Sequence, residues 1–252
     1  MKKFLLSLFF LPFIGFSAPV GNPSCPSTIE EGFFIPDSKA VNFRLGYQIC
    51  DTQDLVMKFE DSLSEKDYSL KKVKAFLNSG LLTFNVKERL DMYFEVGSYR
   101  IQPEFRYIHD FYTAKSENDF LYRAGTKLVL FEILDFTLGA DVKYSYFKAN
   151  SSYVTKNDKP INDNIKFLMK EWQIGVGVSQ KITILRPYIG IAYRDARIHM
   201  NQFLLENLKL VYKKKAGLFL GSSISLGSFV MLNVELRLVN ERSTIFSGEV
   251  RF

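Results

Sequence analysis

The sequence ends with Ser243-Thr-Ile-Phe-Ser-Gly-Glu-Val-Arg-Phe252, in which apolar and polar residues alternate up to the last position. One face, mostly apolar, consists of Thr244, Phe246, Gly248, Val250 and Phe252, and the other of Ser243, Ile245, Ser247, Glu249 and Arg251. A period of two residues predicts a β-strand. In a soluble protein this terminal strand would leave an unpaired edge. In an outer-membrane barrel it pairs with the first strand, and its closing aromatic residue lies in an interfacial girdle.

Three residues of this strand, Phe246, Val250 and Phe252, therefore form the expected assembly signal. The expected partners of the strand are outer-membrane lipid and the barrel-assembly machinery.

The other end of the chain has the features of an export signal. Met1-Lys-Lys3 is basic, residues 4–16 are almost wholly apolar, and Gly15 and Ser17 are suited to a signal-peptidase site. The alternative is an uncleaved anchor, but the apolar run is shorter than the roughly 20 residues of a spanning helix. We expect a signal peptide at 1–17 and a periplasmic N-terminal segment at 18–39, with the barrel at 40–252.

Composition agrees with a strand-built membrane protein. Hydrophobic residues make up 47%, aromatic residues 15% and charged residues 24%, and the mean hydropathy is −0.03. Such values suit a barrel, because only every other strand residue meets lipid. The net charge of +6 falls to +4 without Lys2 and Lys3. This surplus is modest and does not indicate a nucleic-acid partner.

Alternation continues along the chain and divides it into strands. The strands are expected at 41–49, 55–59, 75–87, 90–107, 119–132, 135–148, 171–181, 185–194, 209–225, 229–239 and 243–252. Short links are expected near 50–52, 88–89, 133–134, 182–183, 226–228 and 240–242, and long polar links near 61–74, 108–118, 149–167 and 197–208. Bacterial barrels have short periplasmic turns and longer external loops. If the C-terminus is periplasmic, the last strand starts at the external side, so the short 240–242 turn is an exception among the external links.

The predicted fold is all-β, a transmembrane antiparallel β-barrel. These strands number about eleven, and even strand number is the rule, so we expect about twelve, with ten as the alternative. The twelfth would lie near Thr28–Ile35. A soluble all-β sandwich or barrel competes poorly, because the apolar faces of about nine to eleven residues have no interior partner.

Four short stretches resemble a known family. They are Ala18-Pro-Val-Gly-Asn-Pro23, Phe43-Arg-Leu-Gly-Tyr47, Glu171-Trp-Gln173 followed by Arg186-Pro-Tyr-Ile-Gly-Ile191, and Glu235-Leu-Arg-Leu-Val-Asn-Glu-Arg242 closing on Val250-Arg-Phe252. The chain resembles the chlamydial major outer-membrane protein (porin) family, of which it would be a short, cysteine-poor member. The resemblance implies a porin-like barrel, and a homo-oligomer is compatible with it.

The predicted function is a porin-like channel for passive diffusion of small hydrophilic solutes. The candidate pore-lining residues are Arg44, Gln48, Glu171, Gln173, Lys181, Arg186, Tyr188, Arg194, Asn233, Glu235, Arg237, Glu249 and Arg251. Basic residues outnumber acidic ones here, which predicts a mild anion preference. The alternative is that these charges pair across strands and fill the barrel.

Two other function classes remain open. A structural or adhesin barrel with a plugged lumen would present the polar links 149–167 and 197–208. A barrel hydrolase would rest on His109-Asp110, but adjacent strand residues point to opposite faces, and we expect no enzyme. No metal or cofactor is expected, because no paired His or Cys spacing occurs. Cys25 and Cys50 form one disulfide or stay as thiols.

Overall fold

The computed structural model describes residues 22–28, 41–60, 68–203, 206–226 and 229–252. The elements are α1 (Cys25–Thr28), β1 (Val41–Leu55), β2 (Met57–Phe59), β3 (Tyr68–Val86), β4 (Leu90–Tyr107), β5 (Asp110–Ser116), β6 (Asp119–Ile133), β7 (Phe136–Lys156), β8 (Lys159–Ile161), β9 (Lys166–Gln180), β10 (Leu185–Phe203), β11 (Glu206–Tyr212), β12 (Ala216–Leu226), β13 (Val230–Leu238) and β14 (Glu241–Arg251). In this part of the chain, no helix is long and apolar enough to span a membrane. The predicted signal peptide lies outside the described residues, as does the expected twelfth strand except for Thr28, which ends α1.

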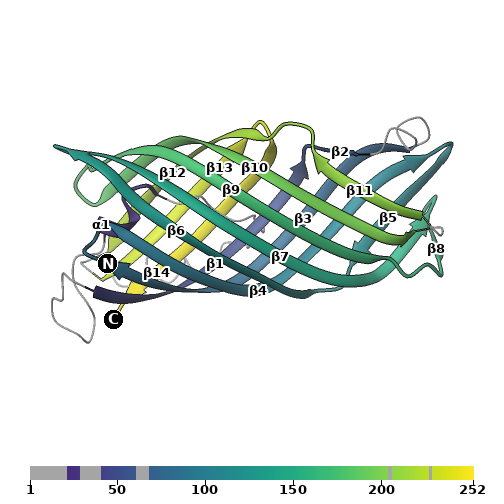
Figure 1. Ribbon diagram of the computed structural model, residues 1–252, viewed down its shortest axis with the longest axis horizontal. Helices are drawn as coiled ribbons and strands as arrows, with labels where there is room; N and C mark the ends of the chain where they lie inside the picture. Colours follow the sequence, from purple (N-terminus) through teal and green to yellow (C-terminus); the bar gives the residue numbers. More distant parts are fainter. Residues whose placement is uncertain (1–21, 29–40, 61–67, 204–205, 227–228) are drawn as a thin grey trace, which may run out of the picture.

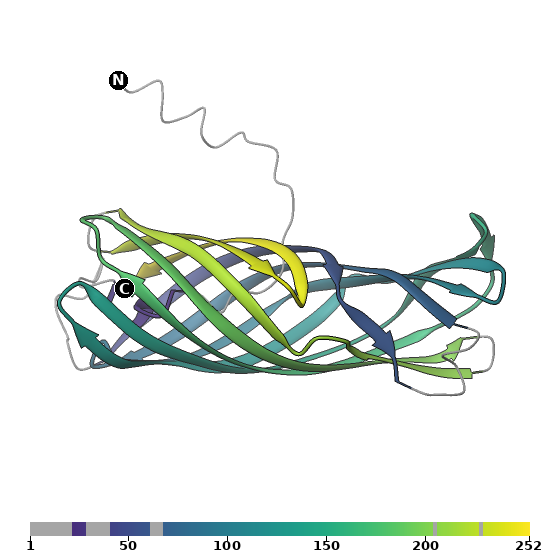
Figure 2. The same ribbon diagram turned by 90° about the horizontal axis from the view of Figure 1, so that it is seen from above.

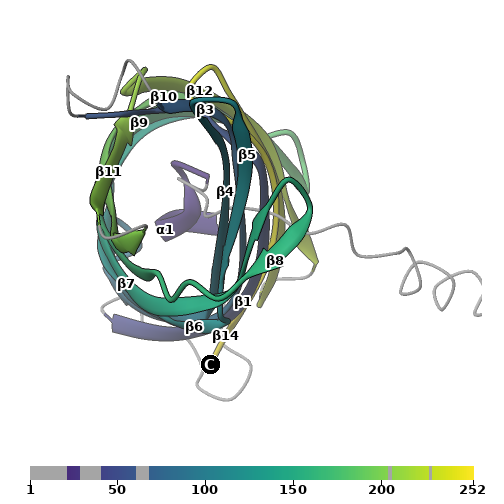
Figure 3. The same cartoon turned by 90° about the vertical axis from the view of Figure 1, so that its right-hand side faces the viewer.

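Ten strands close into an antiparallel ring, so the chain is a β-barrel, and Figures 1 and 3 show the closed wall. The ring runs β1, β3, β4, β6, β7, β9, β10, β12, β13 and β14, and then returns to β1. The predicted pairing of last strand with first is confirmed, with Tyr47 opposite Gly248 and Arg44 opposite Arg251. The described part of the chain has fourteen strands in one sheet, more than either predicted total of about twelve or ten. Ten of the fourteen form the closed ring. One predicted boundary is also wrong, because β1 runs straight through residues 50–52, where a turn was predicted.

The seam between β1 and β3 is the least regular in the ring. Its ladder pairing covers Val41–Phe43 against Phe84–Val86. Farther from the C-terminal end of the barrel, Glu95 of β4 links the two strands. Its Oε1 accepts hydrogen bonds from Gln48 Nε2 of β1, at 3.1 Å, and from Ser79 Oγ of β3, at 2.6 Å. Side-chain hydrogen bonds therefore supplement a short backbone ladder at this seam.

At the end of the barrel opposite the C-terminus, here called the upper end (Figure 2), the wall has fewer strands. Here β5 takes the place of β6 between β4 and β7, and β11 takes the place of β12 beside β10. The short strand β2 continues β1, pairs with β11 and lies against β3. The upper wall thus consists of eight strands: β2, β3, β4, β5, β7, β9, β10 and β11. The long loops predicted at 108–118, 149–167 and 197–208 are wrong in large part, because strands occupy most of these residues.

The narrowing follows from one short hairpin. β13 and β14 are joined at Val239–Asn240, so a short turn lies next to the predicted position, 240–242. The wall closes directly above this turn, because the Val56 N–H donates to the Asn240 carbonyl at 3.0 Å. The Lys213 N–H in turn donates to the Val56 carbonyl at 2.9 Å. β2 and β11 therefore meet above the hairpin.

Along the long strands, the apolar residues lie on the outward face in the lower half of the barrel and on the inward face in the upper half. In the lower half of β4, Met92 and Phe94 point outward and are 45% and 48% exposed, while Asp91 and Glu95 are buried inside. In its upper half the inward residues are Ile101 and Phe105, both fully buried, and the outward ones are polar. Apolar side chains facing outward require lipid, and polar ones require water. The change of face therefore locates the upper membrane boundary.

The outward apolar belt surrounds the lower half of the barrel. On β9 it comprises Trp172, Ile174, Val176 and Val178, all more than a third exposed. On β14 the outward face is the predicted one, with Phe246 exposed and Glu249 and Arg251 buried inside. Phe252 closes the wall, and its N–H donates to the Phe43 carbonyl at 3.0 Å. The belt matches the roughly nine to eleven residues of a membrane-spanning strand.

The position of the belt predicts how much a lysine substitution on β10 destabilises the barrel below and above the membrane boundary. Ile191, on β10, is 62% exposed and points into the belt. Ile191→Lys should destabilise the barrel by about 2–4 kcal/mol, the cost of a lysine facing lipid near the bilayer centre. The measurement is reversible urea unfolding in lipid vesicles. The control, Asn201→Lys, lies above the boundary on the same strand and should change stability by less than about 0.5 kcal/mol. Equal costs would contradict the boundary.

Candidate functional site in the barrel interior

Twelve of the thirteen residues predicted to face the lumen are buried inside the barrel. They are Arg44, Gln48, Glu171, Gln173, Arg186, Tyr188, Arg194, Asn233, Glu235, Arg237, Glu249 and Arg251. The exception is Lys181, for which the prediction is wrong. β9 ends at Gln180, so Lys181 is exposed in the following turn, where its N–H donates to the Asp135 carbonyl at 2.7 Å.

One ion-pair network lies directly below the narrowing and joins β9, β10, β13 and β14. Arg194 pairs with Glu171, at 2.7 Å from Nη2 to Oε1, and with Glu241. Arg237 pairs with Glu235 at 2.8 Å and with Glu241 at 2.9 Å, and donates to Gln173 Oε1 at 3.1 Å. Glu241 is therefore shared by two arginines. All these side chains are buried inside the barrel.

A second network lies on the side of β1, β4 and β6. Arg123 Nη1 pairs with Glu95 Oε2 at 2.7 Å, and Arg123 Nε donates to Ser145 Oγ at 2.8 Å. Arg44 pairs with Asp91 and, at 3.4 Å, with Glu249. These contacts support the alternative weighed from the sequence, in which the interior charges pair across strands.

The buried charges nearly balance. Among the residues that the structure describes, eight are basic (Arg44, Arg123, Lys127, Lys143, Arg186, Arg194, Arg237 and Arg251) and seven acidic (Asp91, Glu95, Asp141, Glu171, Glu235, Glu241 and Glu249). Several of them, such as Asp91, Glu95 and Lys143, were missing from the predicted set. Their signal was present, because each alternates with apolar outward residues on its own strand.

The N-terminal plug, residues Asn22–Thr28 with α1, lies inside the lower mouth of the barrel (Figure 3). Asn22 Nδ2 donates to Ser223 Oγ at 2.9 Å, and Asn85 Nδ2 donates to the Pro26 carbonyl at 3.1 Å. The wall makes room for the plug with glycine, since a Cβ on Gly139 would lie 2.6 Å from the Pro23 carbonyl oxygen. This part of the expected periplasmic segment therefore occupies the lumen.

The two cysteines are buried free thiols, so the disulfide considered from the sequence is absent. Cys25 lies in the plug, where its Sγ is 3.8 Å from Glu249 Oε1 and its carbonyl accepts a 2.7 Å hydrogen bond from Arg44. Cys50 belongs to a different cluster, in the upper core. The expected turn at 50–52 would have kept Cys50 near the periplasmic end. The continuous β1 strand instead carries it away from the plug.

Above the networks, the interior is an apolar core. Fully buried side chains from nine strands contribute to it, among them Phe105, Phe147, Phe167, Ile198 and Leu210. The ring centroids of Tyr99 and Phe147 lie 4.7 Å apart, and those of Phe105 and Tyr112 5.8 Å apart. An eight-stranded barrel is just wide enough for side chains to fill. The narrowed part of the wall therefore surrounds a packed core.

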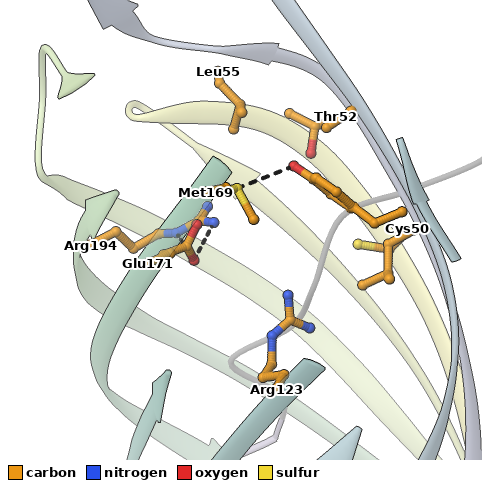
Figure 4. Close-up of a pocket in the computed structure, with 10 residues that line it drawn as sticks. Cys50, Thr52, Leu55, Arg123, Met169, Glu171 and Arg194 are labelled. Carbon is orange, nitrogen blue, oxygen red and sulfur yellow. Dashed lines mark hydrogen bonds and ion pairs between the residues drawn. The ribbon is translucent and has the colours of Figure 1, made fainter. Parts of the chain in front are cut away.

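Figure 4 shows the junction between charged network and apolar core. Arg123, Glu171 and Arg194 line a small cavity together with the apolar side chains of Leu55 and Met169. The cavity has a volume of about 20 Å³. This is room for about one water molecule, which needs ~10–15 Å³ on this measure.

The pair considered for hydrolysis, His109 and Asp110, lies at an exposed rim of the barrel. Asp110 begins β5, where its carboxylate accepts hydrogen bonds from Lys156 Nζ at 2.7 Å and from Asn157 Nδ2 at 2.8 Å. These two hydrogen bonds hold the pKa of Asp110 below its usual value. His109 is exposed at the adjoining turn. Among the described residues, no group of three potential ligands could hold a metal ion.

No family model matches the chain, and no curated protein does. Solved structures similar to it include the outer membrane protease OmpT from Escherichia coli, at 8% identity and a TM-score of 0.43, covering 84% of this chain and 93% of that one. The outer membrane protein OprG from Pseudomonas aeruginosa has 11% identity and a TM-score of 0.40, covering 89% and 99%. The translocator domain of autotransporter NalP from Neisseria meningitidis has 12% and 0.40, covering 85% and 88%. The assignment as a barrel rests on the strand pairing described above.

The shared carboxylate makes a prediction about stability. Glu241→Leu should destabilise the barrel by about 3–5 kcal/mol, because it leaves Arg194 and Arg237 buried with one partner fewer. The measurement is urea unfolding in vesicles. The matched control is Glu104→Gln, which breaks the partly exposed pair with Lys74 and should cost no more than about 1 kcal/mol. Similar losses for both variants would contradict the importance of the buried network.

Proposed function

We propose that the chain is an outer-membrane barrel with a closed lumen, acting as a structural or adhesive protein at the cell surface. The observation that carries the proposal is the apolar core containing Phe105, Phe147 and Phe167, which fills the eight-stranded upper barrel. A hydrophilic solute would have to displace this core to pass. The paired charges and the N-terminal plug support the same conclusion for the lower barrel.

The upper barrel offers the surface for such a role. β7 has 21 residues, about twice what a membrane-spanning strand needs, so its upper half stands in water. The β4–β5 and β7–β8 hairpins form part of the outer end (Figure 1). Ile108 and Tyr153 there are exposed apolar side chains. An adhesive contact would use this end.

The porin function predicted from the sequence is the second candidate. The observation in its favour is the charged interior of the membrane-spanning half. Because basic and acidic side chains nearly balance there, the anion preference proposed for such a pore is slight. We propose no catalytic activity, since the Asp110 carboxylate is engaged by Lys156 and Asn157. Membership of the chlamydial major outer-membrane protein family stays a prediction. So do the expected partners, outer-membrane lipid and the barrel-assembly machinery.

Planar-bilayer recording distinguishes the two candidates. The refolded protein should give no stepwise conductance, because the apolar core blocks the lumen. A general porin refolded alongside serves as the positive control, and heat-modifiable gel mobility verifies folding. A variant lacking residues 18–28 should also be silent, because the core lies above the plug. Conductance steps from either protein would contradict the closed lumen.

Cysteine labelling tests the orientation. The native cysteines are buried, so an introduced cysteine is read against a low background. Lys159→Cys, in the exposed strand β8, should react with a membrane-impermeant maleimide on intact cells. Asp135→Cys, in the exposed turn at the opposite end, should react only after the outer membrane is opened. The reverse pattern would contradict the proposed orientation.

A further inference from the structure

Three basic side chains gather on the outer wall directly above the apolar belt. Lys148, Lys170 and Arg197, here called the cationic patch, lie on the neighbouring strands β7, β9 and β10 (Figure 1). All three are exposed. In the strand register, Lys170 lies directly opposite both Tyr146 and Arg197. Opposed residues on one face have Cβ atoms about 4.5–5.5 Å apart.

The positive charge of the patch is not neutralised by the described residues. None of its three side chains forms an ion pair with them. Two nearby acids have other partners: Asp195, on β10 itself, pairs with Lys215 at 2.8 Å, and Glu60, just after β2, pairs with Lys209. Like charges directly opposite each other, as Lys170 and Arg197 are, destabilise a sheet. A bound anion would remove this repulsion.

A neighbouring histidine reports the same positive surroundings. His199 lies on the outer face of β10, two residues beyond Arg197, and opposite Lys209. Partial burial lowers its pKa, and the charges of Lys209, Lys170 and Arg197 lower it further, against an opposite effect of Glu60.

The side chains below the patch indicate the kind of anion. The next row toward the membrane is Tyr144, Trp172 and Asp195, and Trp172 lies 5.2 Å from the Tyr193 ring between centroids. Below it, Ile174 and Val176 belong to the lipid-facing belt. Aromatic side chains of this kind lie at headgroup level in membrane barrels. A ligand that contacts both rows must therefore carry a negative headgroup on an apolar chain.

We propose that the cationic patch binds the phosphate group of an anionic membrane lipid whose acyl chains lie along Trp172 and the belt below it. The ligand is a phosphate-bearing lipid rather than free phosphate, because the patch is continuous with the apolar surface. The site lies on the outside of the wall and concerns what the barrel binds in the membrane. Its test does not depend on whether the lumen conducts.

Trp172 is the chain's only tryptophan, so its fluorescence reports on this site alone. The protein is refolded into phosphatidylcholine vesicles that contain a small fraction of acyl-brominated phosphatidylglycerol or, in parallel, of acyl-brominated phosphatidylcholine. The anionic lipid should quench Trp172 at least about threefold more strongly, because basic side chains at the surface attract anionic lipid. The variant Lys148→Gln/Lys170→Gln/Arg197→Gln should bring the ratio close to one, and Lys170→Gln alone should lower it.

The control variant, Lys71→Gln/Arg106→Gln, removes exposed basic charges from β3 and β4 and should leave the ratio unchanged. High salt should reduce the preference of the wild type, since screening weakens exposed charges. Equal quenching by the two lipids in the wild type would overturn the proposal. A preference that survives in the triple variant would also overturn it, and if the triple variant does not fold, a preference unchanged in Lys170→Gln would do so. A preference abolished by millimolar inorganic phosphate at constant ionic strength would overturn it as well.

Discussion

The width of a β-barrel is set by the number of strands in its wall, and in this protein that number changes part-way up. The β13–β14 hairpin ends at Asn240, and the Val56 N–H donating to the Asn240 carbonyl closes the wall above it. Val239 takes a φ of 82° in this turn, a conformation that β-branched residues rarely adopt. The tight turn removes two strands from the ring. An interior wide enough for charged networks below thus becomes one that side chains fill above.

The surroundings of the wall change at nearly the same height. Below the narrowing the outside touches lipid, so polar side chains are confined to the interior, where isolated charges would be costly. Arg194, Arg237 and Glu241 offset this cost by pairing across three strands, β10, β13 and β14. Above the narrowing the outside touches water, and the apolar side chains turn inward. Each long strand thus serves as a membrane strand at one end and as a soluble barrel strand at the other.

Much of this was readable from the sequence and some of it was not. Alternation predicted the faces of β14 and most inward residues, because lipid outside and polar groups inside impose a period of two. The exchange of faces had a signal too: in residues 90–107 the apolar positions shift from Met92 and Phe94 to Ile101 and Phe105. Both halves alternate, so period alone misses the shift. The sharing of Glu241 by Arg194 and Arg237 and the docking of the plug depend on contacts between distant residues, for which one sequence has no local pattern.

The central claim is that a packed apolar core, dry and continuous across the barrel, lies above the charged networks. A crystal structure of the refolded protein at a resolution that locates ordered water tests this claim most directly. Water is expected among Arg123, Glu171 and Arg194, and none between Phe105, Phe147 and Phe167. A continuous file of water from Arg237 to the outer end of the barrel would contradict the account.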